Sequence, residues 1–141
     1  SYGLSLLGIA AAHIGSTEQA YECVDMLANL YWTKSFASTH NPKRMMNMDI
    51  SGGYPALIIE MLMYSKRDEL ELLPALPRQW PEGEITGLRA KGGFEVDIVW
   101  QNGILDSAEI RSLLGNPLTI KYAGKTYDTQ PQKGELYVFV P

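Results

Sequence analysis

Residues 94–100 read FEVDIVW and are followed, after Gln101, by the pair Asn102-Gly103. Four apolar side chains, Phe94, Val96, Ile98 and Trp100, alternate in this stretch with Glu95, Asp97 and Val99. Alternation with a period of two is typical of a strand with one buried face, and Asn-Gly favours the tight turn of a two-residue hairpin. The stretch therefore predicts an antiparallel β hairpin with one core face and one wet face.

Similar signals continue on both sides of this hairpin. Turn pairs stand at Gly92-Gly93 and Ala123-Gly124, and prolines punctuate the chain at positions 74, 77 and 81. Alternating apolar positions recur further on, at Leu118, Ile120, Tyr122, Leu136, Val138 and Val140. Residues 71–141 are therefore predicted to form a small antiparallel β domain. Apolar alternation explains its side chains, so we expect it to support a neighbouring domain rather than to bind a ligand itself.

Residues 1–70 have a helical character instead. Residues 2–14 carry apolar side chains on every face, residues 17–32 form an amphipathic pattern, and residues from about 54 to 64 are again nearly all apolar. A helix that is apolar all round must be covered on all sides, which one further helix cannot do. We therefore expect the missing upstream part of the same polypeptide to be a partner of these helices.

Composition excludes several classes of protein. With 141 residues, of which 45% are hydrophobic, the chain has enough material for a globular core. A formal net charge of −4 argues against a nucleic-acid partner, because a phosphate backbone gains affinity from basic side chains. The longest apolar stretch, residues 2–14, is too short to span a bilayer, so no membrane partner is predicted. The single cysteine, Cys23, excludes an internal disulfide and a cysteine-based metal cluster.

One loop and one turn have the character of a functional site. Residues 33–47 show no clean period, and long loops inside a compact domain tend to be functional. Asp49 then precedes Gly52-Gly53, just where a helix is expected to begin. A carboxylate at such a place lies close to free backbone N–H groups. Asp49 is therefore either a helix cap or a catalytic carboxylate, and the residues alone favour the cap.

Three stretches carry a resemblance to a known family. They are ELLPALP at 71–77, WPEG at 80–83 and GLRAKGGFEVDIVW at 87–100. Together they resemble the end of glycoside hydrolase family 95, whose members are α-L-fucosidases and some α-L-galactosidases. The resemblance extends from about residue 36 to residue 112. It implies an α+β chain in which residues 1–70 are the final helices of an (α/α)6 catalytic barrel and residues 71–141 are the antiparallel β domain.

The resemblance also implies site residues. In the family a motif like FQIDGNFGG precedes the last helix, and its aspartate acts as general base. Counting back from the EML of residues 60–62, which resembles the family's EML, aligns Asp49 with that aspartate and Asn47 with the glutamine. His40 resembles the histidine of the preceding loop, across an apparent insertion around residues 43–45. Asp49 is thus the implied base, and His40 and Asn47 are implied substrate-binding residues.

Four positions beside Asp49 depart from the family pattern. Where the family has a small residue, asparagine, phenylalanine and glycine, this chain has Ile50, Ser51, Gly52 and Tyr54. These departures alter the sugar pocket and add Tyr54 to the candidate substrate-binding residues. They also keep open the alternative of a non-catalytic carbohydrate-binding or structural relative with a decayed site.

The chemistry implied by the resemblance is hydrolysis of an oligosaccharide substrate with inversion, in which Asp49 activates a water molecule. The family's general acid is a glutamate far upstream, so these 141 residues are not expected to be active alone. No metal or organic cofactor is needed for such a reaction. The resemblance favours a secreted or periplasmic enzyme.

Overall fold

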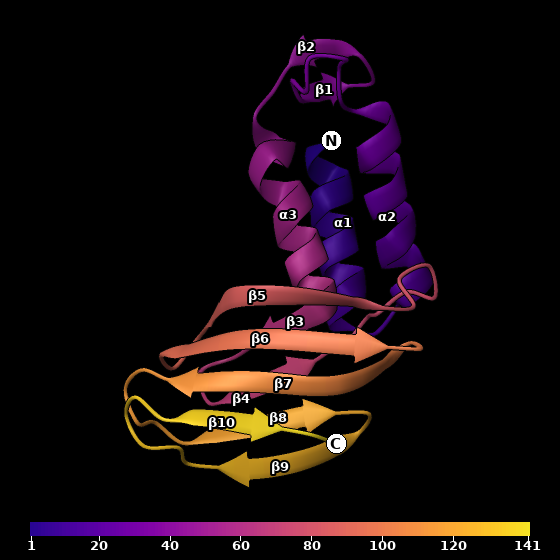
Figure 1. Cartoon of the computed structure of the whole chain (residues 1–141). Helices are drawn as coiled ribbons and strands as arrows, with labels where there is room; N and C mark the ends of the chain where they lie inside the picture. The colour runs from indigo at the N-terminus through magenta and orange to yellow at the C-terminus, as the bar shows by residue number, and fades with distance from the viewer. The chain divides into compact units, whose positions relative to one another are not determined.

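The computed structural model describes residues 1–141, which divide into two compact units, Ser1–Leu62 and Met63–Pro141 (Figure 1). The first unit contains three helices and a short hairpin: α1 (Tyr2–His13), α2 (Thr17–Leu30), β1 (Thr39–Asn41), β2 (Arg44–Met46) and α3 (Asp49–Leu62). The second contains only strands: β3 (Met63–Ser65), β4 (Glu69–Leu72), β5 (Gly83–Ala90), β6 (Phe94–Gln101), β7 (Ile104–Ser112), β8 (Leu118–Tyr122), β9 (Lys125–Thr129) and β10 (Leu136–Phe139). The predicted α+β class is confirmed.

Helix α1 packs closely on both other helices because its buried positions are small. They are Ser5, Gly8, Ala11 and Ala12. A Cβ placed on Gly8 would lie 2.9 Å from Cys23 Cβ on α2 and 2.6 Å from Leu57 Cδ2 on α3. The opposite side of α1 carries Leu6 and Leu7, which are 50% and 46% exposed. The sequence predicts that α1 needs cover on every side, but this unit leaves part of α1 uncovered. None of the three helices has the length and apolar content that crossing a bilayer requires.

Two local predictions for the first unit were wrong in detail. The third helix begins at Asp49 rather than near Tyr54, because Ile50 is fully buried and anchors the first turn. Pro55 consequently lies inside the helix. The segment predicted as an irregular loop contains the β1–β2 hairpin, paired Thr39↔Met46 and Asn41↔Arg44. Nearly all of its residues are exposed, so no alternation of buried side chains marks it in the sequence.

The second unit consists of two four-stranded sheets, ordered β10-β7-β6-β5 and β3-β4-β8-β9. The stretch FEVDIVW forms most of β6 and turns at Asn102-Gly103, both with positive φ, into the antiparallel partner β7. All four of its alternating apolar side chains are buried. The predicted hairpin is confirmed. A hydrogen bond joins the two sheets: the Tyr122 hydroxyl on β8 accepts it from the Leu105 backbone N–H on β7 at 2.8 Å.

Strand pairing corrects the prediction of a purely antiparallel domain. Strand β4 pairs antiparallel with β3 but parallel with β8, in the register Leu70↔Ile120. The unit also begins at Met63, whereas the sequence places the boundary after residue 70. Strands β3 and β4 are short, and β3 follows α3 directly, so no turn pair marks the boundary in the sequence. Strand β10 pairs with β7, and its alternating apolar positions Leu136 and Val138 are exposed, whereas Phe139 is the buried side chain of this strand.

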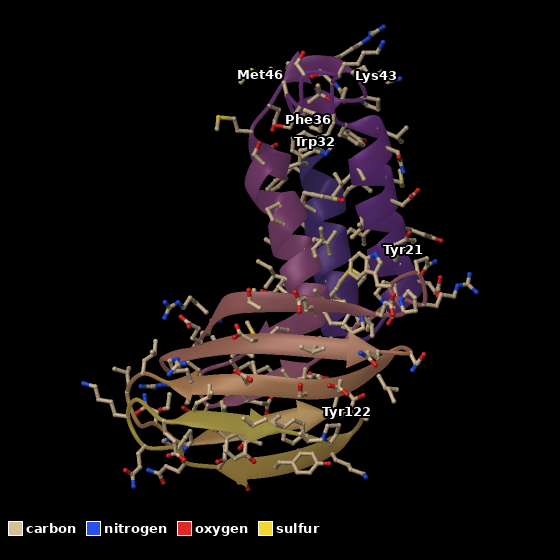
Figure 2. The ribbon with its side chains drawn as sticks, in the orientation of Figure 1. Tyr21, Trp32, Phe36, Lys43, Met46 and Tyr122 are labelled. Carbon is tan, nitrogen blue, oxygen red and sulfur yellow. The ribbon has the colours of Figure 1, made fainter.

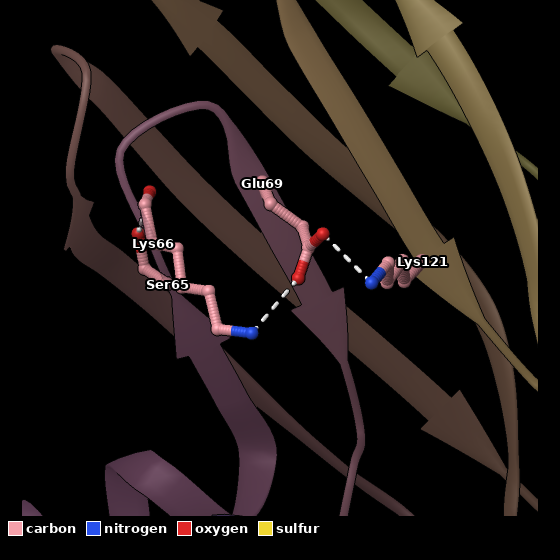
Figure 3. Close-up of polar contacts among 4 residues, drawn as sticks. All are labelled: Ser65, Lys66, Glu69 and Lys121. Atoms are coloured by element: carbon pink, nitrogen blue, oxygen red, sulfur yellow. Dashed lines mark hydrogen bonds and ion pairs between the residues drawn. The ribbon is translucent and has the colours of Figure 1, made fainter.

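A charged cluster lies at the parallel pair of strands (Figure 3). Glu69 on β4 accepts hydrogen bonds from Lys121 Nζ on β8 at 2.7 Å and from Lys66 Nζ at 3.4 Å. The hydrogen bond from Lys121 has the largest effect and lowers the pKa of Glu69; burial, the next largest effect, opposes it, and the hydrogen bond from Lys66 lowers the pKa further. The same contact raises the pKa of Lys121. The cluster therefore stabilises the pairing of β4 with β8 at pH values between the lowered pKa of Glu69 and the raised pKa of Lys121.

Candidate functional site

Three of the four candidate residues lie in contact, and Asn47 is at their centre. Its side-chain N–H2 group donates a hydrogen bond to Asp49 Oδ2 at 2.8 Å and lies 3.3 Å from His40 Nδ1. Its side-chain oxygen accepts the backbone N–H of Asp49. These contacts fix the orientation of the Asn47 amide, because its oxygen accepts a hydrogen bond from a backbone N–H and its nitrogen donates one to a carboxylate. The structure thus brings His40, Asn47 and Asp49 together.

The β1–β2 hairpin and the start of α3 position these side chains. His40 lies on β1, Asn47 directly follows β2, and Asp49 is the first residue of α3. Ser38, which is buried, donates a hydrogen bond from Oγ to the Asn47 carbonyl and lies 3.0 Å, Oγ to Oγ, from Ser51. The Asn47 backbone N–H donates in turn to the Ser38 carbonyl at 3.0 Å. Ser38 therefore ties the base of the hairpin to the first turn of the helix.

Asp49 has a carboxylate that is exposed and only partly used by the protein. It stands at the amino-terminal end of a 14-residue helix, where free N–H groups favour a negative charge. The side-chain oxygen that accepts a backbone N–H at this helix start belongs to Asn47, not to Asp49. Oδ2 of Asp49 accepts the hydrogen bond from Asn47, while Oδ1 takes none from the protein. The capping hydrogen bond is thus supplied by Asn47, which leaves Asp49 open to solvent.

Tyr54 belongs to a different part of the site. It lies five residues beyond Asp49, and so about 140° around the helix from it. Tyr54 lines a pocket of about 360 Å³ together with Ala28, Trp32, Thr33 and Phe36. Its ring meets Trp32 edge to face, with centroids 6.3 Å apart and planes at 73°. Burial, with the negative charge of Asp25 adding to it, raises the pKa of Tyr54, so the phenol is neutral. Asp49 does not line this pocket.

The family is decided by the second unit. Residues 64–138 match the model of "Glycoside hydrolase family 95, C-terminal domain". The chain belongs to glycoside hydrolase family 95. The predicted resemblance is therefore confirmed.

Two curated proteins are similar to this family 95 chain over most of its length. "Alpha-L-fucosidase 2" of Arabidopsis thaliana is 30% identical over 137 residues, which cover 91% of this chain and 16% of that protein. "Probable alpha-fucosidase A" of Aspergillus oryzae is 27% identical over 128 residues, which cover 80% of this chain and 18% of that protein. The chain thus spans less than a fifth of the length of these relatives.

A solved structure shares the fold of this family 95 chain. It is "Putative kojibiose phosphorylase from human microbiome", with a TM-score of 0.59 and 18% sequence identity. The likeness covers 98% of this chain and 19% of that one. Helices followed by a small β unit therefore also occur as one part of a larger solved protein.

Trp32 and Phe36 are pocket residues that the sequence reasoning missed. Figure 2 shows both below the hairpin on which Lys43 and Met46 are labelled. The sequence places Trp32 at the end of the second helix, but α2 ends at Leu30 and Trp32 pairs with Ser38 in an isolated β bridge. Phe36 is 86% exposed and has a positive φ of 57°. The available signal was a pair of aromatic residues close to the point where the amphipathic pattern of residues 17–32 gives way to the segment without a regular period.

Proposed function

We propose that this chain is the carboxy-terminal part of an inverting glycoside hydrolase acting on α-L-fucosides or α-L-galactosides, with Asp49 as general base. Its helices would be the last of an (α/α)6 barrel. Membership of family 95 and two curated relatives named as fucosidases support the substrate class. The observation that carries the role of Asp49 is the hydrogen bond from Asn47 to Asp49 Oδ2, which orients an exposed carboxylate.

The proposed chemistry requires a carboxylate that can take a proton from water. In an inverting enzyme the base and the acid flank the glycosidic bond at about 6.5–9.5 Å, which leaves room for that water. Oδ1 of Asp49 accepts no hydrogen bond from the protein and is the proposed proton acceptor. Its partner Oδ2 is held by Asn47, so the carboxylate has a fixed orientation. The general acid would come from the upstream part of the polypeptide, and this chain alone would not turn over substrate.

His40, Asn47 and Tyr54 are proposed to bind the substrate. His40 and Asn47 adjoin the base, where their ring and amide groups can hydrogen-bond to sugar hydroxyls. Tyr54 offers a neutral phenol and an aromatic face in the neighbouring pocket. Sugar rings are thus held by polar groups near the reacting bond and by aromatic rings away from it.

The test is Asp49→Asn in the full-length polypeptide, compared with Asp106→Asn, an exposed carboxylate on β7. Loss of a general base lowers turnover by about 10²–10⁴-fold. The melting temperature should stay unchanged, because Asn47 still caps α3. A purely structural Asp49 would give the reverse, with activity retained and about 0.5–2 kcal/mol of stability lost. NMR of the first-formed product anomer tests inversion separately.

A non-catalytic carbohydrate-binding relative is the second candidate. The departures beside Asp49 favour it, since Ile50 is fully buried and contributes no polar group to a sugar site. Calorimetric titration of the full-length protein with fucosylated and galactosylated oligosaccharides, beside a hydrolysis assay, separates the two candidates. Binding without cleavage supports this second function, and cleavage rejects it.

A further inference from the structure

The pocket beside α3 has the composition of a sugar-stacking site. Three of its five lining residues are aromatic, and none is charged. Its volume of about 360 Å³ lies within the range of about 300–1,000 Å³ typical of small-ligand pockets. Trp32 and Tyr54 present rings at 73° to each other, so a ligand meets a face of one and an edge of the other. A ligand with an apolar face and a polar rim suits such walls.

The loop that carries Phe36 is held in a strained shape. Phe36 has a φ of 57°, in the left-handed region that residues with a side chain rarely adopt. A closed turn maintains it: Phe36 N–H donates to the Thr33 carbonyl at 3.0 Å, Ala37 N–H to Thr33 Oγ1 at 3.1 Å, and Thr33 N–H to the Ala37 carbonyl at 2.9 Å. Nothing in the core requires this shape, because Phe36 is 86% exposed. Strain of this kind is retained where it presents a side chain to a ligand.

We propose, resting on the function proposed above, that Trp32, Phe36 and Tyr54 form a subsite for a neutral pyranose ring of the oligosaccharide, adjacent to the sugar unit that is cleaved. Asp49 does not line the pocket and lies about 140° around α3 from Tyr54, so the pocket holds a ring other than the one attacked. None of the lining residues is a cation that could pair with the carboxylate of an acidic sugar, and the negative charge of Asp25, which acts on Tyr54, adds to this. Trp32, Phe36 and Tyr54 thus hold the neighbouring ring in surroundings that favour an uncharged sugar.

The test uses the full-length polypeptide and two probes that share one ring, methyl β-D-galactopyranoside and methyl β-D-galacturonide. The NMR signals of the indole N–H groups of Trp32, Trp80 and Trp100, assigned with Trp→Phe variants, report on the pocket. The galactoside should shift the Trp32 signal saturably and leave those of Trp80 and Trp100 in place. The galacturonide should bind at least about tenfold more weakly, because its carboxylate meets a like charge.

Phe36→Ala is the matched variant, since an 86% exposed side chain can be removed without opening the core. It should weaken galactoside binding by about fivefold, with an unchanged pattern of dispersed amide signals. A Trp32 signal that does not respond to either probe overturns the subsite. Equal binding of both probes overturns the selection of neutral sugars.

Asp49→Asn separates this proposal from the proposed function. In the full-length polypeptide the substitution should leave galactoside binding to the pocket unchanged, because Asp49 does not line it. It should lower turnover by about 10²–10⁴-fold. Lost turnover with a silent Trp32 signal rejects the subsite alone, and a responding Trp32 signal with undiminished turnover rejects the base alone.

Discussion

The side chain of Asn47 donates a hydrogen bond to Asp49 Oδ2 at 2.8 Å and accepts the backbone N–H of the same residue. One amide thus has two functions, since it caps helix α3 and orients the carboxylate that we propose as the base. The two functions use different atoms, Oδ1 for the cap and Nδ2 for the carboxylate. Substitutions can therefore separate them.

Asn47→Asp in the full-length polypeptide should retain stability and lose activity. An aspartate keeps an oxygen to accept the Asp49 N–H, but it removes the donor to Oδ2 and places a like charge beside it. Asn47→Ala should lose both activity and about 0.5–2 kcal/mol of stability. Thermal unfolding and turnover of the two variants check this. Equal melting temperatures for Asn47→Ala and the parent would show that the cap is unimportant.

Two glycines of α1 should respond oppositely to alanine. Gly8→Ala places a methyl group 2.9 Å from Cys23 Cβ and 2.6 Å from Leu57 Cδ2, and should destabilise the fold by about 1–3 kcal/mol. Gly3→Ala meets nothing within 4 Å and should stabilise the helix by up to about 1 kcal/mol. Urea unfolding followed by circular dichroism measures both. Similar effects of the two changes would contradict the close helix packing at Gly8.

The Glu69–Lys121 pair should make stability depend on pH. The pKa of Glu69 is lowered from 4.5, so its contribution is complete above pH 4.5 and is lost as the pH falls through the lowered value in the folded state. The pKa of Lys121 is raised from 10.5, so its contribution is complete below pH 10.5 and is lost as the pH rises through the raised value. Both side chains are accessible to solvent, so the effect should be small.

Glu69→Gln is the variant that checks this dependence, with Glu84→Gln on β5 as a control for an exposed carboxylate without an ion pair. Melting temperatures are compared from about pH 7 down to about pH 2. Glu69→Gln should melt a few degrees below the parent at neutral pH, and the difference should vanish in acid. A difference that persists at the lowest pH would contradict the ionic origin.

Phe36→Gly and Phe36→Ala should differ in stability but not in sugar binding. Both remove the ring, but only glycine relieves the positive φ of 57°. The glycine variant should be more stable than the alanine variant by about 0.5–1 kcal/mol, after allowing for the greater freedom of glycine in the unfolded chain. Thermal unfolding of the two 141-residue chains measures the difference. Equal stability would show that the turn relaxes when the ring is absent.

Local sequence signals predicted the central hairpin of the second unit well. The alternation in FEVDIVW and the Asn102-Gly103 turn act between neighbouring residues, so they can be read without knowing the rest of the fold. The parallel pairing of β4 with β8 could not be found in this way. It joins Leu70 to Ile120, which are distant in sequence, and no turn chemistry records such a partner.

The candidate site was predicted only in part, for a similar reason. His40, Asn47 and Asp49 follow one another closely, and the structure brings them into contact through a short hairpin. Tyr54 is equally near in sequence, but the helical rotation carries it to another pocket. That pocket depends on Trp32 and on the turn of Phe36, whose positions follow from hydrogen bonds at Thr33 that a sequence pattern does not reveal.

The parallel neighbour of β4 also affects the order of events during protein synthesis. The hairpin of β3 and β4 leaves the ribosome well before Ile120, so one edge of β4 has unpaired N–H and C=O groups until β8 arrives. The hairpin formed by β6 and β7 needs no such delay, because its partners are translated in succession. Completion of the second sheet thus waits for β8, and until then one edge of β4 is open to pairing with another strand.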